Sequence, residues 1–366
     1  MDVITLLQGD EASCLTPLFL IHPISGVALP FLRLEPLSDY DERPVYGITS
    51  PVHCPGGENF KYPPSLKALA ALYLQEIRDV QPEGPYLLGG WSMGGMVAMF
   101  MAQMLETMGE EVLKVIMIDS ANPEVFPNFS SPEEHREFAK ATFERTLSAG
   151  GLQPDTPSEP SSPILSPLDY ESDVDDYDPM ACSGRFSPTW RSASSSNTTV
   201  TSSASSIFDQ ASPLMSDGSL LSPECMSDES DFDFYDDDCD SDFDDAGEPP
   251  QVRDFMRQMK LHVHHGLELI AGVEPGQLFV PGQKSNFDAV LVKCTSEPMA
   301  VDRRYADHEG VRLIQTVMRE KAMRWDPAQF RSFESIPFSG DHDGAFQPQY
   351  VGELSAILRE CVEDLD

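Results

Sequence analysis

Short apolar runs alternate with longer amphipathic stretches along the first part of the chain. Leu18–Ile21 and Val45–Ile48 are short apolar runs whose length and flanking residues indicate buried strands. Over residues 65–77 the apolar side chains recur at helical spacing, with Ser65 placed as the N-cap and Pro82 beyond the end. Two strands and a helix are therefore predicted before residue 82.

The alternation continues to residue 118. Tyr86–Leu88 is predicted to be a strand, Met93–Met108 a helix that Gly109 stops, and Val115–Ile118 the following strand. Strands joined by helices form right-handed crossovers, which align the strands in parallel. We therefore expect an α/β fold with a mostly parallel central sheet flanked by helices.

The pattern breaks after about residue 150. Residues 151–250 contain 22 serines, repeated prolines and the run SDESDFDFYDDDCDSDFDD, with few aliphatic side chains to bury. Such a segment cannot offset the conformational entropy lost on folding, so we predict that it is disordered. The helical pattern resumes at Val252–Arg257, and Ala289–Val292 indicates another buried strand. We predict one domain made of residues 1–150 and 251–366, interrupted by the 151–250 insertion.

Composition and charge narrow the class of protein. The chain has 366 residues, of which 40% are hydrophobic, so it can bury a sizeable core. Its formal net charge is −37, and the insertion alone holds 23 acidic residues against two arginines. An acidic chain repels phosphate backbones and anionic lipids, so we expect neither nucleic acid nor a membrane as a partner.

The N-terminal residues and the cysteines indicate where the protein is located. No run reaches 18 apolar residues, and the first residues, MDVITLLQGDEAS, lack the basic start of a signal peptide. The seven cysteines are far apart and include no C-x-x-C pair, which favours reduced thiols. We expect a cytoplasmic protein.

A glycine-rich turn follows the strand predicted at Tyr86–Leu88. The pentapeptide G-W-S-M-G at residues 90–94 matches G-x-S-x-G and lies between that strand and the helix from Met93. So sharp a turn forces its serine into a strained backbone conformation, and side chains at Gly90 and Gly94 would collide with the neighbouring strand and helix. Ser92 is thus a candidate nucleophile, although a tight turn with an incidental serine also explains the pentapeptide alone.

A serine hydroxyl becomes a good nucleophile only with a base and an orienting acid. Asp119 directly follows the strand Val115–Ile118, which fits the chain order serine, acid, histidine. Among eight histidines, only His342 lies late in the chain in a short polar loop flanked by glycines, S-G-D-H-D-G at 339–344. We predict that Ser92, Asp119 and His342 form a catalytic triad.

The triad chemistry also needs N–H groups that stabilise an oxyanion. Met93 follows the nucleophile and supplies one such backbone amide. The second is expected from the loop I-H-P-I-S-G at 21–26, where Ile24 is favoured because Pro23 has no N–H. An ordinary strand-to-helix loop explains those residues equally well.

A metal site is not predicted. His262, His264 and His265 occur in LHVHHGLEL, which lacks the one-turn pairing of H-E-x-x-H, and no cysteine accompanies them. We expect neither a metal nor a cofactor.

Taken together, these residues resemble the thioesterase domains of polyketide, non-ribosomal peptide and fatty-acid synthases, within the α/β-hydrolases. The resemblance rests on L-F-L-I-H-P-I-S-G at 18–26, G-P-Y-L-L-G-G-W-S-M-G-G at 84–95, I-M-I-D-S at 116–120 and G-D-H at 340–342. It covers residues 17–125 and 285–350. It implies the same triad and oxyanion amides, and a helical lid that holds Ser131–Leu147 and residues 252–273. The acidic insertion falls inside this lid, and at this point the sequence departs from the family.

The resemblance further implies acyl transfer from a thioester carried on the phosphopantetheine arm of an acyl carrier protein or synthase. Ser92 would form an acyl-enzyme, and release would be hydrolytic or cyclising, as in polyketide or other secondary-metabolite biosynthesis. The chain is expected to be a free-standing enzyme acting in trans, or an excised terminal domain.

Two alternatives remain open from the sequence. One is a carboxylesterase or lipase, although H-P-I replaces the H-G-G-G loop of those enzymes. The other is an interaction protein that uses the acidic insertion to bind a basic partner.

Overall fold

The computed structural model describes residues 3–57, 59–150, 249–279, 282–296, 309–363 and 365. The insertion predicted at 151–250 lies outside the described residues except for its last two. The described residues on both sides of it belong to one compact unit.

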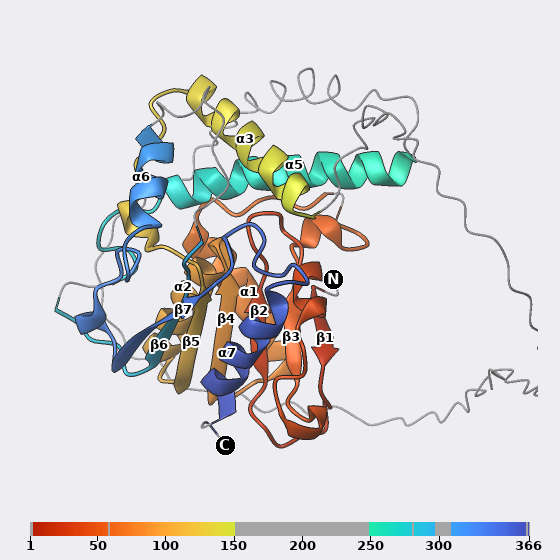
Figure 1. Ribbon diagram of the computed structural model, residues 1–366, viewed down its shortest axis with the longest axis vertical. Coiled ribbons are helices and arrows are strands. Elements are labelled where there is room, and N and C mark those ends of the chain that lie inside the picture. Colours follow the sequence, from red (N-terminus) through yellow and green to blue (C-terminus); the bar gives the residue numbers. More distant parts are fainter. Residues whose placement is uncertain are drawn as a thin grey trace, which may run out of the picture. The chain divides into compact units, whose positions relative to one another are not determined.

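A seven-stranded sheet forms the centre of the described part of the chain (Figure 1). In spatial order its strands are β1 (Ile4–Gln8), β3 (Val45–Ile48), β2 (Leu18–Ile21), β4 (Tyr86–Trp91), β5 (Val112–Ile118), β6 (Asp288–Cys294) and β7 (Ser332–Phe338). β1 pairs antiparallel with β3, and every other neighbouring pair is parallel. The predicted parallel sheet is confirmed, and β1 and β7 add its two edges.

Helices cover both faces of the sheet because the strands between its edges bury side chains on both. Phe19 and Ile21 pack with α1 (Leu66–Val80) and α2 (Met93–Met108) on one face. Leu18 and Leu20 point to the other face, where η1 (Leu29–Arg33) and α7 (Val351–Glu363) cover them. This double burial explains why the predicted strands are short continuous apolar runs.

The ends of α1 and α2 follow the sequence signals. The Ser65 hydroxyl oxygen accepts a hydrogen bond from the Ala68 N–H at 3.1 Å, as an N-cap does. Gly109 adopts a left-handed φ of 84° and ends α2. Both predicted boundaries are confirmed.

Two long helices lie above the sheet in Figure 1, and we call them the lid: α3 (Pro132–Gly150) and α5 (Pro250–Ala271). Both belong to the chain between β5 and β6, where helices were predicted. Phe138 and Phe143 of α3 pack against Met259 and Val263 of α5. The shorter helix α6 (Glu309–Val317) adds Val311 to the same apolar cluster. The lid therefore has a small core of its own.

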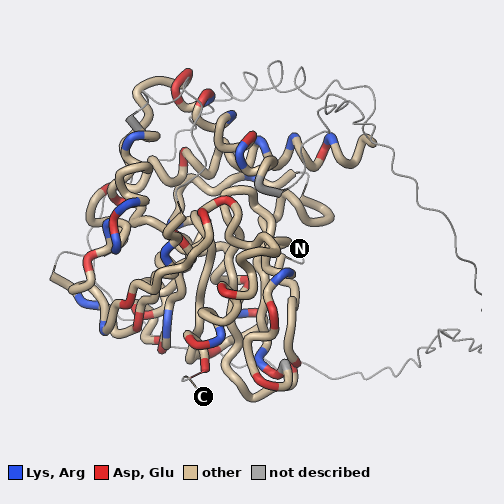
Figure 2. The backbone as a smooth tube through the Cα atoms, in the orientation of Figure 1, with Lys and Arg blue, Asp and Glu red and all other residues tan. Residues whose placement is uncertain are grey.

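Charged residues of both signs are interspersed along the helices and loops of the described part (Figure 2). Among the residues that the structure describes, no helix combines the length and apolar character needed to cross a bilayer.

Candidate active site

Ser92 lies in the turn between β4 and α2, at the carboxyl end of the sheet. Its backbone has φ 55° and ψ −120°, the strained conformation expected of this turn. A Cβ built on Gly90 would come within 2.3 Å of the Gly94 carbonyl carbon, and one on Gly94 within 2.1 Å of the Ile21 oxygen. Both predicted collisions are present, so glycine at these two positions lets β4, α2 and β2 approach closely.

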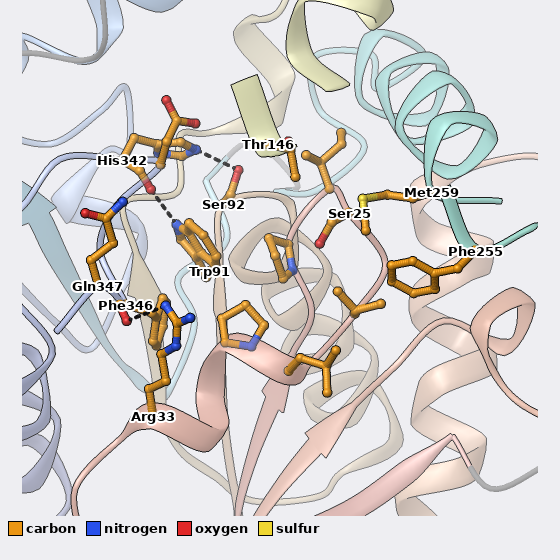
Figure 3. Close-up of a pocket in the computed structure, with 16 residues that line it drawn as sticks. Ser25, Arg33, Trp91, Ser92, Thr146, Phe255, Met259, His342, Phe346 and Gln347 are labelled. Carbon is orange, nitrogen blue, oxygen red and sulfur yellow. Dashed lines mark hydrogen bonds between the residues drawn. The ribbon is translucent and has the colours of Figure 1, made fainter. Parts of the chain in front are cut away.

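Ser92, His342 and Asp119 form one hydrogen-bonded chain. The Ser92 Oγ lies 3.0 Å from Nε2 of His342, and Nδ1 of His342 lies 2.8 Å from Oδ2 of Asp119 (Figure 3). These contacts join the ends of β4 and β5 to the loop after β7, across as many as 250 residues of sequence. The structure thus brings together the three residues that the sequence singled out.

Asp119 is buried but has several partners. Its Oδ1 accepts hydrogen bonds from the Cys294 N–H at 3.0 Å and from Nζ of the buried Lys293 at 3.2 Å. Burial alone would raise the pKa of Asp119, but the hydrogen bond with His342 and the nearby Lys293 charge lower it below its ordinary value. Asp119 therefore stays ionised at neutral pH and holds the His342 ring in one orientation.

The Asp119 carboxylate changes the pKa of His342. Burial alone would lower the pKa of His342, but the hydrogen bond and charge of Asp119 raise it above its ordinary 6.5. The Trp91 indole N–H donates to the His342 carbonyl at 3.1 Å, as Figure 3 shows, and so anchors the loop. Next along that loop, Asp343 lies 3.4 Å from the guanidinium of Arg145 on α3. The imidazole is thereby tied to the sheet and its loop to the lid.

The two amides expected at the oxyanion hole lie in adjoining segments. Met93 is the first residue of α2, so its N–H has no partner within the helix. The side chains of Ile24 and Met93 meet at Gly266 of α5, where an added Cβ would lie 3.0 Å from Ile24 Cδ1 and 3.1 Å from Met93 Sδ. Their role as oxyanion donors stays a prediction.

Three histidines that sequence reasoning left without a role hold the loop that contains Ile24. Nδ1 of His22 donates to the Pro23 carbonyl at 2.7 Å, Nδ1 of His262 to the Ile24 carbonyl at 2.9 Å and Nε2 of His53 to the Ser25 carbonyl at 3.1 Å.

Burial keeps these three rings neutral. It lowers the pKa of His22 to about 4 and lowers the pKa values of His53 and His262 as well. A neutral imidazole has a single N–H, and each ring uses it on one of three successive carbonyls. The loop is therefore held by its own His22, by His53 and by His262 of the lid helix α5.

Two cavities meet at Ser92 and His342. The larger, about 360 Å³, is lined by apolar side chains that include Leu29 and Pro30 of η1 and Phe255 and Met259 of α5 (Figure 3). The smaller, about 100 Å³, lies under the lid and α6. Both also touch Ile24, so a substrate can extend to either side of the serine.

Known proteins similar in sequence to this chain include a thioesterase and a polyketide synthase. A family model described as the thioesterase domain matches residues 16–146. Thioesterase pytI of Aspergillus terreus is 33% identical, and the alignment covers 100% of both chains. A non-reducing polyketide synthase of Pseudevernia furfuracea is 38% identical over 128 residues, which are 35% of this chain and 6% of the synthase.

A solved structure supports the fold. The NocB thioesterase domain from the nocardicin cluster matches with a TM-score of 0.53 and 17% identity, covering 99% of this chain and 100% of that domain. The chain thus has the α/β-hydrolase fold of such domains.

Proposed function

Because the chain belongs to the thioesterase family and is a hydrolase acting on thioesters, we propose that Ser92, His342 and Asp119 are its catalytic triad. The proposal rests on the hydrogen-bonded chain from Ser92 through His342 to Asp119, which opens onto both cavities. Ile24 and Met93 are proposed to donate their backbone N–H groups to the oxyanion.

In the first half of the reaction, the Ser92 oxygen attacks the thioester carbonyl carbon while Nε2 of His342 takes the serine proton. The tetrahedral oxyanion is stabilised by the two amides. The C–S bond then breaks, His342 returns the proton to the departing sulfur, and an acyl-serine ester remains.

In the second half, His342 takes a proton from the group that attacks the acyl-serine. Water gives a free acid, whereas a hydroxyl of the acyl chain itself, or an acidic C–H that becomes a carbanion when it loses its proton, gives a ring. The C–O bond to Ser92 breaks, and the serine recovers its proton from His342.

The proposed substrate is a polyketide-type acyl chain on the phosphopantetheine arm of a carrier protein, acted on in trans in secondary-metabolite biosynthesis. The similarity to pytI over the whole chain and to part of a polyketide synthase supports this class. The carrier protein or synthase is the proposed partner, and no cofactor takes part in the steps above.

The test compares wild type with Ser92→Ala on one acyl N-acetylcysteamine thioester. Turnover should fall to background in Ser92→Ala, because the nucleophile is lost, while the circular dichroism spectrum stays unchanged. Ser148→Ala, which removes a hydroxyl from α3, serves as the control and should keep its activity. Undiminished hydrolysis by Ser92→Ala would refute the proposal.

The same assay separates a thioesterase from an esterase. We expect kcat/KM for the thioester to exceed that for a p-nitrophenyl ester of the same acyl chain. A clear preference for the oxygen ester would instead assign the site to ester hydrolysis.

A further inference from the structure

A cluster of possible metal ligands joins the two lid helices away from Ser92. His135 belongs to α3, and His264 and Glu268 lie one turn apart on α5. One ligand atom from each residue can be chosen so that all three atoms lie within 4.8 Å of one another. None of the three residues lines the cavities at Ser92.

The spacing of these atoms is close to that of ligands on one metal ion. Oε1 of Glu268 lies 3.7 Å from Nδ1 of His135 and 3.6 Å from Nε2 of His264. Both separations are longer than a hydrogen bond. Tetrahedral zinc with bonds of about 2.0 to 2.1 Å holds its ligands about 3.3 to 3.4 Å apart. Both carboxylate-to-ring separations exceed the zinc value by a few tenths of an ångström, and all three ligand atoms lie within 4.8 Å of one another.

Neighbouring groups orient two of the ligands. Nε2 of His135 donates to the His264 carbonyl at 3.1 Å, which leaves the lone pair on Nδ1. Oε2 of Glu268 accepts from Nδ1 of His265 at 3.1 Å, which leaves Oε1 for a metal. Such second contacts fix the ring tautomer and the carboxylate orientation in known metal sites.

The protonation states also suit metal binding. Burial lowers the pKa of His135 and lowers that of His264 to about 4, so both rings are neutral at pH 7. The hydrogen bond from His265 lowers the pKa of Glu268, which is therefore a carboxylate. No proton has to leave before the ligands bind a cation.

We propose that His135, His264 and Glu268 bind one Zn²⁺ ion that clips α3 to α5. Two imidazoles and a carboxylate are a donor set that zinc favours. The Glu268 side chain is 43% exposed, so water can fill the fourth position.

The proposed ion links the two lid helices, α3 and α5, which cover the active site. His135 and His264 are 129 residues apart, on opposite sides of the 151–248 segment. Because Thr146 of α3 and Met259 of α5 line the larger cavity, an ion between the helices fixes two of its walls.

The experiment measures Zn²⁺ binding to the untagged full chain by competition with a chromophoric chelator, and Co²⁺ binding by visible absorption. Wild type should bind one equivalent, and its Co²⁺ form should show the intense bands of tetrahedral coordination. In His135→Ala and Glu268→Gln we expect at least a tenfold loss of affinity. Glu144→Gln makes the same charge change as Glu268→Gln but on α3, outside the cluster, and should bind like wild type.

Carboxylates of the 151–248 segment would not give the same Co²⁺ spectrum, because Co²⁺ bound by oxygen ligands alone is octahedral and absorbs weakly. If His135→Ala or Glu268→Gln fails to fold, His135→Cys decides. It should bind Co²⁺ with a sulfur-to-cobalt charge-transfer band, and absence of that band would count against the site. Wild-type affinity retained in Glu268→Gln, or no saturable binding by wild type, would overturn the proposal.

Discussion

At the scale of single residues, the charge on Asp119 sets the pH at which His342, the proposed base, becomes neutral. Asp119 accepts hydrogen bonds from His342, Lys293 and the Cys294 amide, so it remains ionised in the interior. The ionised carboxylate stabilises the imidazolium and raises the pKa of His342. The base is thus stronger than a free histidine but needs a higher pH to become neutral.

This predicts an acid limb in the pH profile of kcat/KM. Only neutral His342 takes the serine proton, so kcat/KM should fall as the pH drops through a midpoint above 6.5, the ordinary pKa of histidine. Asp119→Asn should lose about 10⁴-fold in kcat. Steady-state rates across the neutral range test both, and a midpoint below 6.5 would contradict the charge state inferred for Asp119.

The sequence was sufficient to select Ser92, Asp119 and His342, because each has a local signature: a G-x-S-x-G turn, a strand end and a polar glycine-flanked loop. It did not reveal Lys293 or the roles of His22 and His262. Lys293 and His262 contact residues far away in the chain: 174 residues separate Lys293 from Asp119, and 238 separate His262 from Ile24.

At the scale of elements, α5 of the lid contacts the loop that contains Ile24. His262 is buried on α5 and donates a hydrogen bond to the Ile24 carbonyl. That carbonyl belongs to the same residue as the N–H proposed as an oxyanion donor. Its ring also packs edge-on against His22, with ring centroids 5.0 Å apart. A shift of α5 should therefore move the Ile24 amide.

We predict that His262→Leu lowers kcat about tenfold to a hundredfold with little change in KM, because a misplaced oxyanion donor weakens binding of the transition state. His262→Asn keeps a side-chain N–H near the position of Nδ1 and should recover most of the rate. Thermal melting of both variants separates this positioning effect from stability. A destabilised His262→Leu protein with wild-type kcat would show a merely structural role.

Elements at the sheet edges escaped prediction for a physical reason. β7, SFESIPF, is only partly buried and contains Pro337, so it lacks the continuous apolar run of the central strands. β1 is likewise half-buried at the opposite edge. From the sequence, His264 is not expected to be a metal ligand because it lacks H-E-x-x-H spacing; its proposed partner His135 comes from α3, 129 residues away.

At the scale of the whole molecule, the 151–248 segment interrupts a fold whose proposed catalytic residues all lie outside it. Long insertions between elements cost little in loop-closure free energy. We predict that replacing residues 151–248 by a flexible Gly/Ser linker leaves kcat/KM for a small acyl thioester unchanged. Loss of that activity in a folded variant would show that the segment contributes to the active site.

The same variant should be assayed on a carrier-bound thioester. A selective loss there, with the small thioester still cleaved, would assign the segment to partner binding.

The most direct test of the account is detection of the acyl-enzyme. Wild type and Ser92→Ala are mixed with a panel of acyl N-acetylcysteamine thioesters, quenched rapidly in acid and analysed by intact mass and peptide mapping. We predict that wild type gains the mass of one acyl group on the peptide containing Ser92, and that Ser92→Ala gains none. An adduct on another residue such as Cys54, or an equal adduct in Ser92→Ala, would contradict the assignment of Ser92 as the nucleophile.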